Sequence, residues 1–260
     1  MVEVLARFGL DGRLPPSGLT VDSPLEQRHA FAAMSEEGMG AIFDSIANEL
    51  AAPDGVTTPA TTITGIAGND ITLYISRPDE MPGPMPAVLH LHGGAMAING
   101  AADVCYVRLR EHLAATGLVV VGVEFRNSSA TLGPHPFPAG LNDCASAARW
   151  VSENRDELGV SRIVASGESG GGNMTLTLAH KAKREGWVGE MAGFYAQCPY
   201  ISNRWLDGGD DLPSLYENDG YFISCEQAGL LGSLYDPAGS HADDARCWEL
   251  AANDEELRGL

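Results

Sequence analysis

Short apolar runs that alternate with helix-favouring stretches constrain the fold of this chain more than any other feature of its sequence. Each run is apolar almost without interruption, as expected for the strands of a parallel sheet that helices cover on both faces. Strands and helices in regular alternation indicate an α/β fold with a doubly wound, mostly parallel sheet. The expected strands are 61–64 and 70–76 (a hairpin), 87–91, 118–123, 162–166 and 193–196, with helices at 103–116, 141–157 and 172–186.

Two further regions flank this alternating part. Residues 1–53 contain a stretch, 23–50, whose apolar residues recur at helical spacing, which predicts either a helix covering the core or a lid over a ligand site. We therefore expect an N-terminal cap region at 1–53 and an α/β core at 54–260. The last part, 201–260, is acidic and is expected to be rich in loops.

Composition disfavours several classes of function. The 260 residues carry 16 basic and 35 acidic side chains, a net charge of −19, which disfavours nucleic-acid and anionic-membrane partners. We expect no membrane span and no signal peptide, because no apolar run is long enough for either. The five cysteines are far apart and form no CxxC pair, so we expect neither disulfides nor a metal site. Free cysteines in turn predict a cytoplasmic location. The glycine motifs of nucleotide-binding sites do not occur where such a site would need them.

The pattern GxSxG at 167–171 is the strongest indication of chemistry. It comprises Gly167, Glu168, Ser169, Gly170 and Gly171 and follows an apolar strand just before a helical stretch. A nucleophilic serine on a strained turn requires this strand–turn–helix context, and the glycines allow the close packing of the turn. The amino end of the helix would also direct amide donors at a developing oxyanion. The alternative is a glycine-rich turn without chemistry.

A second motif, His92-Gly93-Gly94-Ala95, follows the expected strand 87–91. Acyl transfer requires hydrogen-bond donors directed at the negatively charged oxygen of the tetrahedral intermediate, and a loop of this type supplies them in esterases. We expect the amides of Gly94 and Ala95 to form the oxyanion hole together with that of Gly170, while Gly93 sets the turn. Taken alone, the motif is equally compatible with a plain turn.

These motifs resemble those of the bacterial hormone-sensitive-lipase-like esterases, and within that family the brefeldin A esterase branch. The resemblance extends over about residues 60–200 and implies an α/β-hydrolase fold, a helical cap and hydrolysis of carboxylic esters without a cofactor. Ala95 stands where the family usually has glycine, and Glu168 where it commonly has aspartate. The resemblance rests on HGGA at 92–95, HPFPAGLND at 135–143, GESGGGN at 167–173, LPSLYENDGYFI at 212–223 and YDP at 235–237.

The base that would activate the serine is not evident. In this fold the order along the chain is Ser, then Asp or Glu, then His, and only His180 and His241 follow Ser169. His180 lies eleven residues along the same helix, about 16 Å away at 1.5 Å per residue. His241 lies in an acidic loop and is expected to be an exposed surface residue. We assign neither residue as the base, and we identify no acid.

The earlier histidines have other expected places. His92 belongs to the oxyanion loop, His90 packs in the sheet, and the rest are loop or helix-surface residues, namely His29, His112 and His135. The family has two more strands that carry the Asp and the His. We therefore expect this polypeptide to be the amino-terminal two-thirds of an esterase, with the missing part in a further segment or a second chain. The sequence leaves open whether the chain forms a homo-oligomer.

Three hypotheses follow. The first is a serine esterase acting through an acyl-enzyme on a small-molecule ester, with lactones and macrolides included. The second is a small-molecule binding protein, because the fold also resembles plant gibberellin receptors, which lack the catalytic histidine. The third is an inactive partial domain, which would be poorly soluble because its sheet has an unpaired hydrophobic edge.

Overall fold

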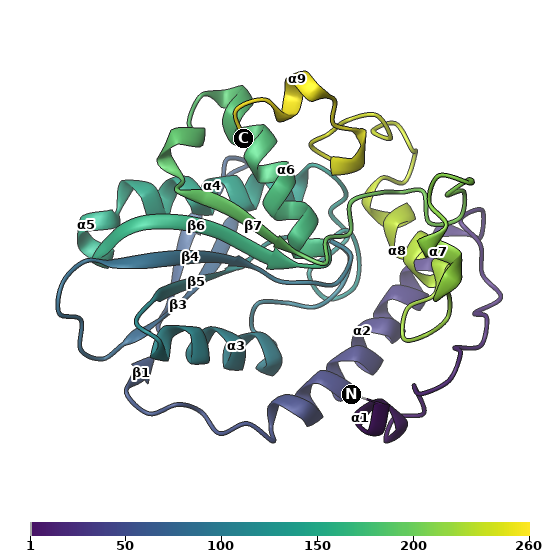
Figure 1. The fold of residues 1–260 in the computed structure, drawn as a ribbon, viewed down its shortest axis with the longest axis horizontal. Coiled ribbons are helices and arrows are strands. Elements are labelled where there is room, and N and C mark those ends of the chain that lie inside the picture. Colours follow the sequence, from purple (N-terminus) through teal and green to yellow (C-terminus); the bar gives the residue numbers. More distant parts are fainter. Residues whose placement is uncertain (1) are drawn as a thin grey trace.

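Residues 2–260, the part of the chain that the computed structural model describes, contain a seven-stranded sheet with helices on both faces (Figure 1). The strand order is β1-β3-β5-β4-β6-β7, and β2 pairs with β3. Strands β5, β4, β6 and β7 are parallel, whereas β1, β2 and β5 are antiparallel to β3. The strands are β1 (Val56–Thr57), β2 (Ala60–Thr64), β3 (Asp70–Pro78), β4 (Met85–Leu91), β5 (Val119–Glu124), β6 (Val160–Glu168) and β7 (Gly193–Gln197).

The helices of the core cover the two faces as the sequence predicts. Helix α3 (Val104–Ala115) packs on one face, and α4 (Ala139–Glu153) and α6 (Gly170–Glu185) pack on the other (Figure 1). Two short elements, α5 (Arg155–Leu158) and the 3-10 helix η1 (Val188–Glu190), complete these connections. The central strands are apolar because both of their faces are buried. The fully buried side chains between the layers include Leu89, Val121, Ile163 and Leu178.

The amino-terminal region forms α1 (Val2–Ala6) and the long helix α2 (Leu25–Ala47). The helix predicted at 23–50 is confirmed with slightly shorter bounds. It buries only a narrow stripe, with Phe31 and Ala32 inside, and packs against α3 and α8. In Figure 1, α2 and α8 lie beyond the carboxyl ends of the parallel strands, to the right of the sheet. The N-terminal region therefore covers the edge at which the site loops emerge.

The carboxyl-terminal region contains more helix than the sequence predicts. It forms α7 (Ser214–Glu217), α8 (Cys225–Tyr235), the 3-10 helix η2 (Glu249–Ala251) and α9 (Asp254–Leu257). The sequence does not predict α8, because Gly229 and Gly232 lower helix propensity. These glycines permit close packing: a Cβ at Gly232 would lie 2.5 Å from the Tyr200 hydroxyl. Tertiary contact therefore outweighs local propensity here.

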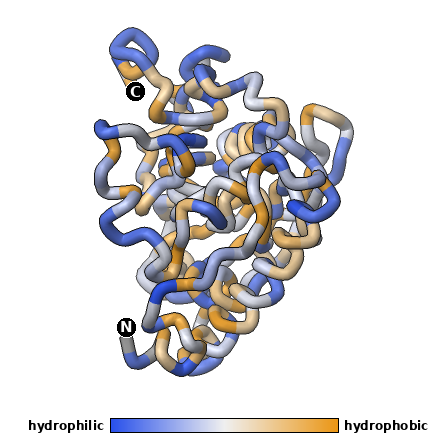
Figure 2. Tube along the Cα trace, turned by 90° about the vertical axis from the view of Figure 1, so that its right-hand side faces the viewer, coloured by the Kyte–Doolittle hydropathy of each residue, from blue (hydrophilic) through white to orange (hydrophobic). Residues whose placement is uncertain are grey.

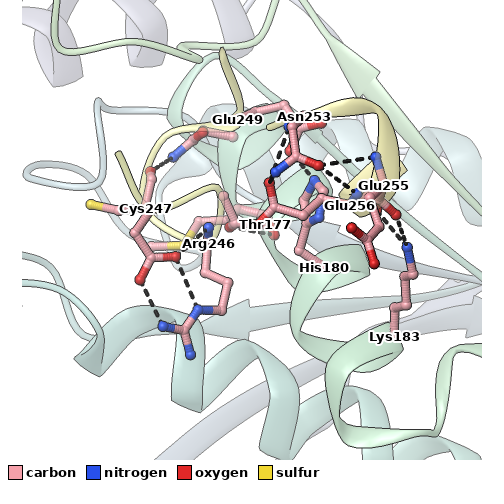
Figure 3. A network of polar contacts seen from close by, with 12 residues as sticks. Thr177, His180, Lys183, Arg246, Cys247, Glu249, Asn253, Glu255 and Glu256 are labelled. Atoms are coloured by element: carbon pink, nitrogen blue, oxygen red, sulfur yellow. Dashed lines mark hydrogen bonds and ion pairs between the residues drawn. The ribbon is translucent and has the colours of Figure 1, made fainter. Parts of the chain in front are cut away.

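The end of the chain is bound to the outer side of α6 (Figure 3). The Lys183 ammonium donates to the carbonyl oxygens of Glu255 and Glu256 at 2.8 and 2.7 Å. His180 Nε2 lies 2.7 Å from Glu249 Oε2, and both side chains are mostly buried. Figure 2 shows that the segments near the C-terminus and the outer loops are largely hydrophilic. These polar contacts add to apolar burial earlier in the segment, where Cys247 and Trp248 lie in the core.

Two predictions about the whole chain can be compared with the structure. All five cysteines lie within the described residues, and all are free. No helix of residues 2–260 combines the length and the apolar character that crossing a membrane requires.

Candidate active site

Ser169 occupies the sharp turn between β6 and α6, as the motif predicts. Its backbone has φ 54° and ψ −116°, a conformation that costs a non-glycine residue of the order of 1 kcal/mol or more. Three hydrogen bonds hold this conformation. The Ser169 amide donates to the Gln197 carbonyl at 2.9 Å, and its own carbonyl accepts from the amides of Asn173 (3.0 Å) and Tyr200 (2.9 Å). Ser169 as a residue is partly exposed.

The glycines around Ser169 are required by the packing of the turn. A Cβ at Gly170 would lie 2.6 Å from the amide nitrogens of both Ala95 and Met96. A Cβ at Gly171 would lie 2.6 Å from the His92 carbonyl oxygen. Real Cβ atoms do not approach backbone atoms so closely, so these positions allow no larger residue without a shift of the backbone. The turn of Ser169 therefore packs directly against the loop that follows β4.

That loop presents unused amide donors. Gly94 has φ +111°, and its carbonyl accepts from the Ala97 and Ile98 amides at 2.9 and 3.0 Å, which closes a tight turn. Within residues 2–260 the amides of Gly94, Ala95 and Gly170 donate to no protein acceptor. Free amides beside a partly exposed serine are what an oxyanion hole needs.

Glu168 joins the two motifs. Its Oε1 accepts from the Gly93 amide at 2.9 Å, and its Oε2 lies 3.2 Å from His90 Nε2. Burial raises the pKa of the Glu168 carboxyl, but the His90 contact and the Gly93 amide outweigh burial and hold the pKa below its usual value. The Gly93 amide is thus engaged in the framework and not in the hole, in agreement with its predicted role in the turn. The sequence indicated a carboxylate here but not this bridging contact.

His92 fixes the start of the loop that follows β4. Its ring stacks on Phe125 with centroids 4.1 Å apart, and its Nδ1–H donates to the Gly93 carbonyl at 2.8 Å. Burial lowers the pKa of His92 to about 4. A neutral ring with its Nδ1 proton committed to the backbone acts as a packing element, which agrees with its placement in the loop.

The two histidines after Ser169 in the sequence are engaged elsewhere. His180 faces Glu249 on the outer side of α6. His241 differs from the exposed residue that was expected: its side chain is 38% exposed, and its Nδ1 lies 3.0 Å from Oδ1 of the buried Asp236. The difference arises because the loop folds back so that the imidazole also packs edge-on against Phe137. No hydrogen bond joins Ser169 to a histidine in the described part of the chain.

A cavity of about 560 Å³ lies between α2 and the loop 129–134. Its lining includes His29, Glu36, Ser129 and Thr131, and it contains none of the motif residues. Among residues 2–260 no three His, Cys, Asp or Glu side chains are grouped so that they could hold a metal ion.

Comparison with known proteins agrees with this geometry. Residues 88–260 match a family model described as the alpha/beta hydrolase fold. The solved structure of brefeldin A esterase, a bacterial homologue of human hormone sensitive lipase, superposes on this chain with a TM-score of 0.95 at 42% sequence identity. The match covers 100% of this chain and 73% of the brefeldin A esterase chain. The chain therefore belongs to the α/β-hydrolase fold family, in the branch of the bacterial hormone-sensitive-lipase-like esterases.

Two curated relatives are similar over shorter regions. Carboxylesterase NlhH of Mycobacterium tuberculosis is 37% identical over 120 residues, which is 45% of this chain and 36% of that protein. Gibberellin receptor GID1 of Oryza sativa subsp. japonica is 27% identical over 183 residues, 68% of this chain and 49% of that protein. The chain thus spans about half or less of the length of these two relatives.

Proposed function

We propose that this chain carries the nucleophile and the oxyanion hole of a serine-dependent carboxylic ester hydrolase. The observation that carries the proposal is the set of unused amides of Gly94, Ala95 and Gly170 around Ser169 on its strained turn. Similarity to a carboxylesterase and to brefeldin A esterase supports the same class of reaction.

In the proposed reaction, Ser169 Oγ bonds to the acyl carbon, and the three amides stabilise the negative charge on the carbonyl oxygen. The bond to the leaving alcohol then breaks, and the alcohol takes up the proton that the serine lost. Water hydrolyses the acyl-enzyme and releases the carboxylic acid. No metal or cofactor takes part in this scheme.

A serine needs a base and a partner that orients the base. Because His180 and His241 are engaged with Glu249 and Asp236, we propose that neither acts on Ser169. We propose instead that the histidine and its carboxylate come from outside these residues, either from a further segment or from a second chain. Their side chains would approach Ser169 from the partly exposed side of the turn.

Turnover of p-nitrophenyl esters by the full-length protein that carries this chain tests the proposal. We expect Ser169→Ala to lower kcat/KM by about 10⁴-fold or more, as loss of a nucleophile does in serine hydrolases. Ser161→Ala is the matched control, because Ser161 is exposed at the opposite end of β6. Equal turnover by the two variants would refute Ser169 as the nucleophile.

We further propose small esters as substrates, including cyclic esters such as macrolide lactones. We take residues 1–53 to be the cap region and residues 54–260 to be the core. A panel of p-nitrophenyl esters with different acyl chains and of lactones would define the substrate class.

The five free cysteines support a reducing compartment such as the cytoplasm.

A binding protein is the second candidate, and the similarity to a gibberellin receptor is the observation that favours it. The two functions predict different results with one ligand. An enzyme releases alcohol at a rate that depends on Ser169, whereas a receptor retains the intact ligand, with or without Ser169→Ala.

A further inference from the structure

One carboxylate of the cap helix α2 forms a polar contact with the loop of the oxyanion hole. Glu36 Oε1 accepts from the backbone amide of Asn99 at 2.8 Å. Glu36 Oε2 accepts from the Thr131 amide at 3.2 Å and from the Thr131 hydroxyl at 2.5 Å. A single half-buried side chain therefore joins α2 to two core loops, 94–99 and 129–134.

The loop that Glu36 contacts needs external support. Ala95, Met96 and Asn99 have φ values of 53°, 58° and 68°, in the left-handed region that non-glycine residues seldom occupy. Such conformations persist only where surrounding contacts outweigh their cost, which is of the order of 1 kcal/mol or more for each residue. The position of the proposed amide donors therefore depends on the contacts that hold this loop.

Most of those contacts come from the core. The Met96 carbonyl accepts from the amide and the hydroxyl of Ser128, and the Asn99 carbonyl accepts from the Asn127 side chain at 2.6 Å. The Gly93 amide donates to Glu168. Among the polar contacts to residues 93–99 in the described part of the chain, the one from Glu36 comes from the N-terminal region.

Apolar packing joins α2 to the same loop. Ala32 of α2 is fully buried in a small cluster with Ala97, Ile98 and Leu234. Ala32 and Glu36 are four residues apart, so both lie on one side of the helix. Figure 1 shows α2 beside α8 beyond the sheet edge, where this cluster lies.

We propose that Glu36 is a positioning residue that fixes the oxyanion loop only while α2 is docked on the core. The inference rests on the proposed esterase function of the same site and adds a role for the cap in the hydrolysis itself. Loss of the Glu36 contact would leave ester binding intact and would lower the fraction of molecules whose Gly94 and Ala95 amides are correctly placed. The effect should therefore appear in kcat more than in KM.

The test compares Glu36→Gln with Glu26→Gln, which removes the same charge from an exposed residue on the same helix. Gln keeps one acceptor oxygen but places an N–H₂ group against the second set of donors. Amide hydrogen exchange is measured on peptides that cover residues 94–101. We expect exchange about tenfold faster in Glu36→Gln than in Glu26→Gln, the size expected for one lost charge-assisted hydrogen bond. For ester hydrolysis we expect kcat to fall about tenfold and KM to stay within about twofold.

Thr131→Val provides a second variant, because it removes one donor to Glu36 and leaves α2 unchanged. If Glu36→Gln folds poorly, Thr131→Val should show a smaller change of the same kind, and Thr131→Ser should restore wild-type behaviour. Equal exchange at 94–101 in Glu36→Gln and Glu26→Gln would overturn the proposal, as would faster exchange with unchanged kcat. Because exchange needs no turnover, failure of the esterase function itself would be recognised separately, by the lack of Ser169-dependent hydrolysis.

Discussion

Single residues at the site combine strain with contacts that compensate for it. Ser169 and the loop residues Ala95 and Met96 all have positive φ, and each is held by backbone hydrogen bonds or by packing from a neighbouring element. The sequence predicts the strained turn at Ser169, because a serine flanked by glycines between a strand and a helix is typical of a nucleophile turn. It does not predict the positive φ of Ala95 and Met96. It does not predict the contacts of Glu168, because which side chain a carboxylate meets depends on tertiary structure.

Gly170→Ala tests the close contact between the two motifs. An added Cβ would lie 2.6 Å from the Ala95 and Met96 amide nitrogens, so the oxyanion loop must move away. We expect kcat to fall about 100-fold, since a displacement of about 1 Å at a reacting centre can cost that much. The control is Gly189→Ala, whose Cβ would meet no atom within 4 Å. Similar kcat values for the two variants would contradict the contact.

His92 should make stability depend on pH. Its folded-state pKa of about 4 lies below the ordinary value of 6.5, so the unfolded chain binds the proton more readily. The stability contributed by His92 is therefore complete above pH 6.5 and is lost as the pH falls toward 4. Between pH 7 and pH 4.5, wild type should lose about 2 kcal/mol more unfolding free energy than His92→Gln.

Urea denaturation at the two pH values measures this difference. His112→Gln is the control, because it makes the same replacement at an exposed residue near the end of α3. Equal losses in wild type and His92→Gln would show that His92 is not a buried neutral group.

Secondary-structure elements were predictable wherever periodicity was strong. The hairpin β2–β3, the parallel strands and helices α2, α3, α4 and α6 lie close to their expected positions. Helix α8 was not predictable, because Gly229 and Gly232 weaken its local pattern and its stability comes from packing on Leu206 and Tyr200. The pairing of His241 with Asp236 was likewise not predictable from local sequence, since it depends on how the loop folds back on Phe137.

An ion pair with a buried carboxylate joins α4 to the segment that follows β5. Asp143 of α4 is 1% exposed, and it accepts from the amide, Nε and Nη2 of Arg126, which follows β5. Asp143→Ala leaves these donors without their acceptor, so we expect a loss of about 3 kcal/mol in unfolding free energy. The exposed pair Arg149–Glu153 is the control, and Glu153→Ala should cost less than about 0.5 kcal/mol. Comparable urea midpoints for the two variants would disprove the structural role of Asp143.

At the scale of the whole molecule, topology brings the two motifs together. Strands β4 and β6 are parallel neighbours, with Leu91 opposite Gly167, so the loops that follow them emerge at the same edge of the sheet. Ligand sites of open α/β sheets lie at the carboxyl ends of the strands for this reason. The sequence predicts both loops but not that α2 packs against one of them, because nothing in the periodicity of 23–50 specifies its partner.

Covalent labelling tests the central claim most directly. The protein is treated with a fluorophosphonate, and the modified peptide is identified by mass spectrometry. We predict a single adduct on Ser169 that is absent in Ser169→Ala and retained in Ser161→Ala. An adduct on another serine, or no adduct in a protein that still hydrolyses esters, would contradict Ser169 as the nucleophile.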